Sequence, residues 1–304
     1  MIESDPYSTA KGVEDAIKAA ARMAFEADPS LTTDERIRLE YFNRFLSRIF
    51  SEGADSQWLL KGGTGLLARV PSARATLDID LLRERYDLND ALVELQRLAG
   101  VDLHDHFRFI YMGHEAILVG DGQPYVEGFR VNFDTYIGAQ KKGRIRIDLS
   151  SGVGLTGEPT VMAPVGALSL PRLAMASYRL HPIVDQIADK VCATMYLHDN
   201  RASSREKDLV DLVVVALTQD VDGSLLGAAI ENEVRRRKMS PFKCFVIPSG
   251  WGTAYSRLAQ KIPYCQGVEH IDTARDLVAS FINPALDGSA VERMWKSDAR
   301  RWTN

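Results

Sequence analysis

The fold is decided by two neighbouring segments of the chain, WLLKGGT at residues 58–64 and TLDIDLL at residues 76–82. The first segment is a short apolar run that stops at two glycines, which predicts a strand entering a tight turn before a helix. The second segment alternates in its first half, which predicts another strand. Because side chains i and i+2 of a strand point the same way, Asp78 and Asp80 share one face of it.

Each segment could form a ligand-binding site, and each also has an ordinary structural explanation. Gly62 and Gly63 let backbone N–H groups approach a phosphate closely, and a following helix N-terminus favours an anion, yet a plain strand–turn–helix corner needs no ligand. Asp78 and Asp80 are about 7 Å apart along the strand. At that spacing two carboxylates can share a pair of divalent metal ions, whereas two solvated acids on a strand edge need none.

A third acid follows on a later strand. The segment RIRIDL at residues 144–149 predicts a strand in which Asp148 lies on the same face as Arg144 and Arg146. Two interpretations stay open. Either Asp148 pairs with one of these arginines across a sheet, or it acts as a third metal-facing acid or as the base for an attacking hydroxyl.

Further charged residues gather in the later, helical part of the chain. Lys190 precedes the segment REKDLVD at residues 205–211, in which Asp208 and Asp211 are i and i+3 on one face of a predicted helix. A salt-bridged surface helix explains this pattern, and so does a cluster of active-site charges.

The chain of 304 residues is long enough for two domains. Helices are expected within residues 8–50. Between residues 58 and 149 we expect strands, with helices at 64–69 and 87–98 and a hairpin turn at residues 120–124, and beyond about residue 180 mostly helices. A stretch rich in glycine and proline at residues 152–164 is the best boundary. We therefore expect an α+β fold, with a mixed β-sheet flanked by helices at residues 1–160 and a mostly helical C-terminal domain at residues 161–304.

The composition limits the kinds of partner that the protein can bind and indicates its cellular compartment. Lys and Arg number 37 against 41 Asp and Glu, a net charge of −4, which excludes a chain that binds nucleic acid through bulk positive charge. Basic clusters at residues 141–146, 235–238 and 300–301 could still neutralise phosphates, or be ordinary solvated charge. The three cysteines form no zinc pattern, and the His104-Asp105-His106 segment predicts a surface loop. With no apolar run long enough to span a membrane and no signal-peptide pattern, we expect a cytoplasmic protein.

Taken in order, these features resemble the nucleotidyltransferase superfold with the DNA polymerase β-like palm. More narrowly, the chain resembles the AbiEii/AbiGii-type nucleotidyltransferase toxins, the group that includes the mycobacterial MenT-like toxins. The resemblance covers roughly residues 55–290. It is carried by KGGT at 61–64 with Leu67 and Arg69, Arg74-x-Thr76-x-Asp78-x-Asp80, Ile145-x-Ile147-Asp148, QIADKV at 186–191, residues 205–212, Trp251 with Tyr255, and FINP at 281–284.

The resemblance implies a role for each matching residue. Asp78 and Asp80 hold Mg²⁺, with Asp80 also catalytic, and Asp148 occupies a catalytic position that is acidic but not always aspartate. Lys190 neutralises triphosphate charge, and Asp211 completes the active site from the helical domain. The remaining residues bind the nucleotide: Lys61, Gly62, Gly63, Thr64 and Thr76. In some relatives the place of Thr76 carries a hydroxyl that can be phosphorylated.

The implied activity is that of a toxin in a toxin–antitoxin or abortive-infection system. Such an enzyme uses Mg²⁺ to transfer NMP from an NTP to the 3′ end of tRNA, releases pyrophosphate and blocks translation, and a separate antitoxin protein restrains it. Two alternatives remain: phosphoryl transfer to a protein hydroxyl such as Thr76, and a catalytically silent binding module of the same fold. The intact Asp78 and Asp80 pair, with Lys190 and Asp211, argues against silence.

Overall fold

The computed structural model describes residues 6–71, 74–117, 128–152, 154–196, 203 and 205–304. These residues form two compact units. Unit 1 takes in the described residues up to Leu180 except 154–158, and unit 2 comprises residues 154–158 and the described residues from His181 to Asn304. The hairpin turn expected at residues 120–124 lies outside the described residues.

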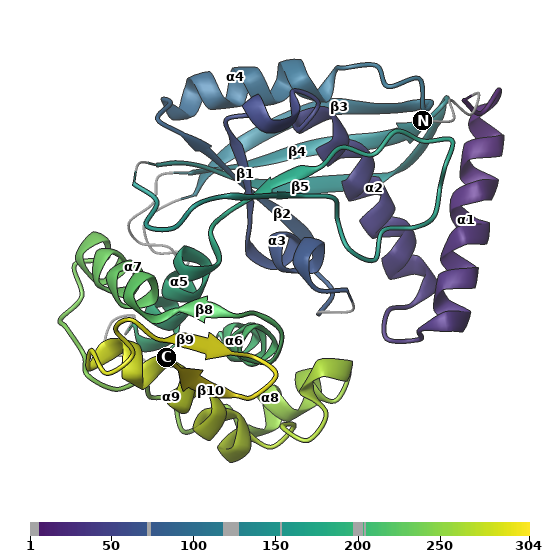
Figure 1. Ribbon diagram of the computed structural model, residues 1–304. Coiled ribbons are helices and arrows are strands. Elements are labelled where there is room, and N and C mark those ends of the chain that lie inside the picture. The colour runs from purple at the N-terminus through teal and green to yellow at the C-terminus, as the bar shows by residue number, and fades with distance from the viewer. Residues whose placement is uncertain (1–5, 72–73, 118–127, 153, 197–202, 204) are drawn as a thin grey trace. The chain divides into compact units, whose positions relative to one another are not determined.

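Unit 1 is built on a mixed sheet, of which Figure 1 labels β1 to β5. The sheet has seven strands in the order β3-β4-β5-β2-β1-β7-β6. Strand β2 runs antiparallel to β1 and parallel to β5, and β1 runs parallel to β7. The strands are β1 Trp58–Lys61, β2 Asp78–Glu84, β3 Phe107–Ile117, β4 Gly128–Ile137, β5 Gln140–Gly152, β6 Thr160–Met162 and β7 Tyr178–Leu180. Because β7 pairs with β1, unit 1 extends past residue 160, where the sequence suggested a boundary.

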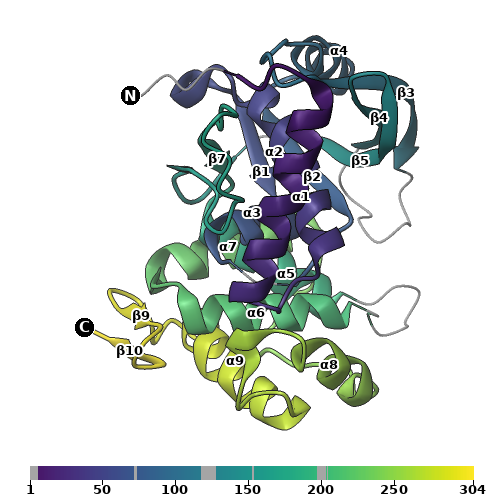
Figure 2. The ribbon, with the colours of Figure 1, turned by 90° about the vertical axis from the view of Figure 1, so that its right-hand side faces the viewer.

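Helices flank this sheet, as expected for the α+β class. They are α1 Ala10–Ala27, α2 Thr33–Ile49, α3 Gly62–Arg69 and α4 Leu88–Ala99, with a 3₁₀ turn at Gly53–Asp55. A capping box formed by Thr32 and Glu35 starts α2, which packs beside α1 (Figure 2). The apolar face of α2, including Phe45, shares one core with Ile79 and Leu81 of β2.

The alternation of β2 determines which side chains stay out of this core. Ile79 and Leu81 are fully buried, whereas Asp78 and Asp80 are only partly buried. On β5 the same alternation buries Ile147 and leaves Asp148 partly exposed. The three acids therefore share the face of the sheet opposite the helix-covered core.

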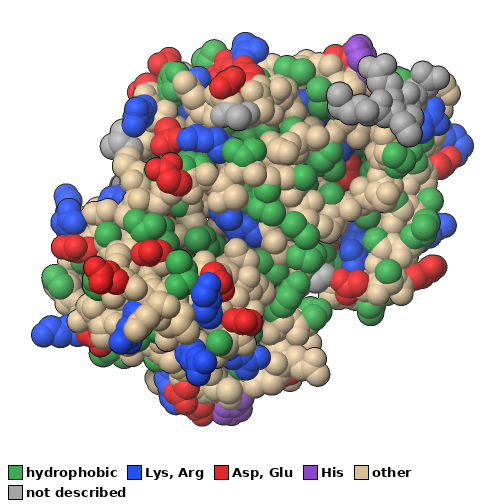
Figure 3. All heavy atoms as spheres, in the orientation of Figure 1, with side chains coloured by type: hydrophobic (Ala, Val, Ile, Leu, Met, Phe, Trp, Pro, Cys, Tyr) green, Lys and Arg blue, Asp and Glu red, His purple; other side chains and the backbone are tan. Residues whose placement is uncertain are grey.

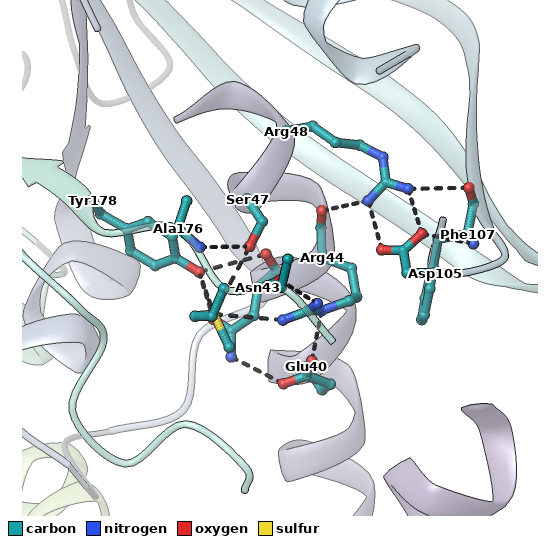
Figure 4. A network of polar contacts seen from close by, with 11 residues as sticks. Glu40, Asn43, Arg44, Ser47, Arg48, Asp105, Phe107, Ala176 and Tyr178 are labelled. Carbon is teal, nitrogen blue, oxygen red and sulfur yellow. Dashed lines mark hydrogen bonds and ion pairs between the residues drawn. The ribbon is translucent and has the colours of Figure 1, made fainter. Parts of the chain in front are cut away.

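A buried ionic network fastens α2 inside unit 1 (Figure 4). Arg48 binds both carboxylate oxygens of Asp105, at 3.0 and 2.6 Å, and Arg44 Nε lies 2.7 Å from Glu40 Oε1. Arg48 also donates to the backbone oxygen of Phe107 at 3.1 Å. Asp105 is 1% exposed. The expectation of a surface loop at His104–His106 is therefore wrong for its central residue, because Arg48 draws that carboxylate inward.

Unit 2 is mostly helical, as expected. Its helices are α5 Ile183–Met195, α6 Glu206–Thr218, α7 Gly223–Arg236, α8 Gly252–Ala259 and α9 Ile271–Leu286, with a 3₁₀ turn at Pro263–Cys265. Strands β8 Val221–Asp222, β9 Met294–Lys296 and β10 Arg301–Thr303 form a small sheet that the sequence did not suggest. The Trp295 indole ties this sheet to α6 by donating to the Ala216 carbonyl at 2.8 Å. Among the described residues, no helix has the length and apolar character needed to cross a bilayer.

Candidate active site

Gly62 and Gly63 form the turn between β1 and α3, called here the glycine corner. This corner lies directly against the side chain of Asp80. Gly62 follows β1 and opens α3 with a φ of +58°, a left-handed conformation that glycine adopts without steric cost. A Cβ atom at this position would lie 1.9 Å from Asp80 Oδ2. Both the turn and the close approach of the carboxylate therefore require glycine here.

Two threonine hydroxyls form hydrogen bonds with the backbone at the start of β2, beside the glycine corner. Thr64 Oγ1 donates to the Asp78 backbone oxygen at 2.8 Å, and Thr76 Oγ1 donates to the same oxygen at 3.2 Å. A Cβ atom on Gly63 would lie 3.2 Å from Thr76 Oγ1, so this turn also packs closely against the strand that follows it. The structure thus brings together the residues predicted to bind nucleotide and those predicted to bind metal.

The pairing of the strands aligns four of the charged residues in one row. Lys61 of β1 lies opposite Asp80 of β2, Asp80 opposite Asp148 of β5, and Asp148 opposite Arg130 of β4. Partners on neighbouring strands point their side chains to the same face of a sheet. Asp148 is therefore the direct lateral neighbour of Asp80, although 68 positions of chain separate their numbers, from 80 to 148.

Asp78 and Asp148 each have an arginine as an ion-pair partner. Arg146 Nε lies 3.1 Å from Asp78 Oδ1. Arg130 binds both oxygens of Asp148, at 3.0 and 3.3 Å. The sequence suggested Arg144 or Arg146 as the partner of Asp148, and this is wrong, because strand pairing places Arg130 beside Asp148 while Arg144 pairs with Asp134 at 2.8 Å.

Arg130 is thus a residue of the site that the sequence analysis missed. Its only signal is the alternation of GFRVNF at residues 128–133, in which Val131 is buried and Arg130 takes the other face. That signal becomes informative only when β4 is known to pair with β5.

Asp78 and Asp80 suit a divalent cation. Carboxylate oxygens are the ligands that Mg²⁺ prefers, and the missing side chain of Gly62 lets the Asp80 carboxylate lie directly against the glycine corner. Asp78 Oδ1 is shielded from solvent and accepts no hydrogen bond from any residue that the structure describes. Within the same part of the chain, no three His, Cys, Asp or Glu side chains are grouped closely enough to hold one metal ion. A metal-binding role therefore depends on the aspartate pair.

Lys190 of α5 lies in a buried cluster within unit 2. Its Nζ is 2.5 Å from Asp211 Oδ2 and 3.2 Å from Asp208 Oδ1, and Arg205 Nε is 2.9 Å from Asp208 Oδ2. Lys190 is 4% exposed and Asp211 is fully buried. A salt-bridged surface helix is therefore the wrong description, because α5 packs against α6 and encloses these charges.

Two of the three predicted basic clusters are occupied by internal ion pairs. Lys141 and Arg144 both pair with Asp134, and the hydrogen bonds from these two cations lower the pKa of that carboxyl below its usual value. Arg236 and Arg237 both pair with Glu233. Figure 3 accordingly shows acidic and basic side chains interspersed over the face that it presents.

Comparison with known proteins identifies one family. The sequence profile described as nucleotidyl transferase AbiEii toxin, Type IV TA (toxin–antitoxin) system, matches residues 44–290. No curated protein sequence matches the chain significantly. A Helicobacter pylori protein assigned as a nucleotidyltransferase is similar in structure, at 15% sequence identity and a TM-score of 0.44, over 83% of this chain and 96% of that one. JHP933 from Helicobacter pylori is similar at 15% identity and a TM-score of 0.43, over 84% of this chain and 94% of its own.

The family match spans most of the chain and includes the glycine corner, the aspartate pair and the buried Lys190 cluster. The mixed sheet, its flanking helices and the helical second unit agree with the fold class expected from the sequence. The chain belongs to the AbiEii nucleotidyl transferase toxin family of type IV toxin–antitoxin systems.

Proposed function

We propose that this protein is a toxin that uses Mg²⁺ to transfer NMP from an NTP to the 3′ end of tRNA, with release of pyrophosphate. The observation that carries the proposal is the contact between the glycine corner and Asp80, where a Cβ on Gly62 would lie 1.9 Å from the carboxylate. A phosphate-binding turn and a metal-binding acid must be adjacent in such an enzyme, because the triphosphate bridges them.

In this proposal the corner binds the triphosphate. The N-terminal end of α3, with Gly62, Gly63 and Thr64, provides backbone N–H groups and the positive end of the helix dipole. Lys61 and Thr76 flank that end, Lys61 as a cation opposite Asp80 and Thr76 as a hydroxyl beside Gly63. These groups orient the α-phosphorus towards the acceptor hydroxyl.

The acids of β2 hold the metal. Asp78 and Asp80 present carboxylates on one face of the strand. Bound Mg²⁺ stabilises the negative charge that builds on the phosphoryl oxygens and on pyrophosphate as it leaves. Asp148, beside Asp80, is the candidate to accept the proton of the attacking hydroxyl, a role that requires its bidentate pair with Arg130 to open.

Unit 2 supplies Lys190 and Asp211 in this proposal. Lys190 provides a point charge for the triphosphate, and Asp211, 2.5 Å from its ammonium group, orients it. The tRNA acceptor, the separate antitoxin protein and action in the cytoplasm are supported by the family resemblance rather than by any feature of these side chains.

The test is to incubate the purified chain with Mg²⁺, each labelled NTP in turn, and total tRNA. Label in RNA from an NTP labelled at its α-phosphorus supports the proposal, label in protein from an NTP labelled at its γ-phosphorus supports phosphoryl transfer to a hydroxyl such as Thr76, and no label at either position with any NTP supports a silent binding module. Sequencing tRNA 3′ ends after induction then identifies the acceptor and the number of nucleotides added.

Two variants make this test specific. Asp80→Asn keeps the shape of the side chain but removes its charge, and we expect it to abolish labelling without unfolding the chain. Glu115→Gln is the matched control, because Glu115 lies in the same row of the sheet but on β3, beyond Arg130. Retained labelling in Asp80→Asn contradicts the assignment of Asp80.

A further inference from the structure

The Asp78–Arg146 pair lies where the proposed function needs a metal. Asp78 of β2 and Arg146 of β5 are register partners, and Arg146 Nε lies 3.1 Å from Asp78 Oδ1. The two side chains are 41% and 49% exposed. We propose that Arg146 is an internal counter-cation of Asp78, which competes with the divalent metal for this carboxylate and is displaced when the metal binds. This inference rests on the proposed metal site.

The competition follows from the chemistry of a single oxygen. Asp78 Oδ1 faces the guanidinium at ion-pair distance, but it accepts no hydrogen bond from the described residues. The contact is therefore mainly Coulombic and lacks the directional bonds that make a guanidinium–carboxylate pair strong. A cation at this distance occupies the space in which a metal ion would coordinate the same oxygen, so both cannot bind it together.

The neighbouring pair on the same face is built differently. Arg130 forms two hydrogen bonds with Asp148, one to each oxygen. Such a bidentate pair resists exchange more strongly than the single contact of Arg146. The geometry therefore separates a replaceable guanidinium at Asp78 from a more firmly held one at Asp148.

The protein offers a matched control for Arg146. Arg144 lies two positions earlier on β5 and on the same face, and its side chain is 48% exposed, against 49% for Arg146. Its partner is Asp134 of β4, which the proposed function does not use. Removing Arg144 changes the net charge of this face equally and leaves Asp78 untouched.

The experiment measures metal binding without nucleotide or turnover. Mn²⁺, a paramagnetic substitute for Mg²⁺, is titrated into the purified full-length chain, and unbound Mn²⁺ is followed by electron paramagnetic resonance. We expect Arg146→Gln to bind Mn²⁺ about two- to fivefold more tightly than wild type, the range set by a half-exposed ion pair. Arg144→Gln stays close to wild type, and Arg146→Lys, which keeps the positive charge, lies between the two. Thermal unfolding midpoints verify that all variants are folded.

Equal or weaker Mn²⁺ binding by Arg146→Gln overturns the inference, and so does equal tightening by Arg144→Gln, since that would reflect net charge alone. Asp80→Asn distinguishes this failure from failure of the proposed function. If Asp80→Asn weakens Mn²⁺ binding while Arg146→Gln has no effect, the proposed metal site is supported and only the counter-cation role of Arg146 is wrong. If Asp80→Asn binds Mn²⁺ as wild type does, the proposed metal site is wrong and the counter-cation role falls with it.

Discussion

Exposed and buried ion pairs both occur among the described residues, and they differ in exposure rather than in residue type. On the polar face of the unit 1 sheet, Asp78 and Arg146 are each about half exposed. In the unit 2 cluster, the Lys190 and Asp211 side chains are 5% and 0% exposed, and the Arg48–Asp105 pair in unit 1 is 1% exposed on both sides.

Exposure determines what each pair can do. Water competes for both partners of an exposed pair, so its net contribution to stability is small and the partners can exchange for a metal or a substrate. A buried pair is different, because removing one partner leaves an uncompensated charge without solvent. We therefore expect substitutions on the polar face of the unit 1 sheet to change metal or substrate binding, and substitutions in the buried pairs to lower the free energy of unfolding.

The largest expected loss of stability comes from Arg48→Ala. This change leaves Asp105 charged and buried, and it also removes hydrogen bonds to the backbone oxygens of Arg44 and Phe107. The free energy of unfolding should fall by about 5 kcal/mol, the upper end of the range for breaking a buried pair. Urea unfolding measures this loss. The control is Arg97→Ala, which breaks an exposed pair with Glu94 and should leave the urea midpoint unchanged.

Lys190→Ala should be the next most damaging change. It removes the cation that pairs with Asp208 and Asp211, but Arg205 still pairs with Asp208. We therefore expect the free energy of unfolding to fall by about 3 kcal/mol. Urea unfolding is again the measurement, with Lys207→Ala, which removes an exposed lysine of α6, as the control. A fully stable Lys190→Ala protein would contradict the structural role.

Gly62→Ala should separate activity from stability. The left-handed conformation, φ +58°, costs an L-residue about 1 kcal/mol, a modest loss of stability. The new Cβ must also push the Asp80 carboxylate aside, and a displacement of about 1 Å can lower a catalytic rate about 100-fold. Gly53→Ala is the matched control, since Gly53 has a φ of +64° with nothing within 4 Å of its Cβ position. Equal activity losses in both variants would contradict the proposed site.

The smallest effect concerns a pair of intermediate burial between α1 and β5. Hydrogen bonds from Lys142 and Lys18 lower the pKa of Glu14 from 4.5 to about 2. Because the folded pKa is the lower one, Glu14 stabilises the fold above pH 4.5, and this contribution is lost as the pH falls towards 2. We expect Glu14→Gln to lower the unfolding free energy by about 1 kcal/mol at pH 6. The difference from wild type should shrink in urea titrations at lower pH, and a constant difference would contradict the ionic origin.

Local patterns were enough to predict the elements of the site. The apolar run before Gly62 predicted β1 and the corner, and the alternation around Ile79 predicted that Asp78 and Asp80 share a face. The helical second half also followed from periodicity. The partner of Asp148 and the burial of Asp105 could not be predicted, because each depends on an arginine distant in the sequence, Arg130 and Arg48 respectively.

Periodicity along the chain thus accounts for which residues form strands and helices and which face each side chain takes, since these depend on near neighbours. Only the pairing of β2 with β5, and of β5 with β4, decided which charges meet on the polar face of the unit 1 sheet. Only the packing of α5 on α6 decided that Lys190 and Asp211 lie away from solvent. Burial and pairing join segments far apart in the chain, and they are governed by the free energy of the whole packed unit rather than by any local sequence preference.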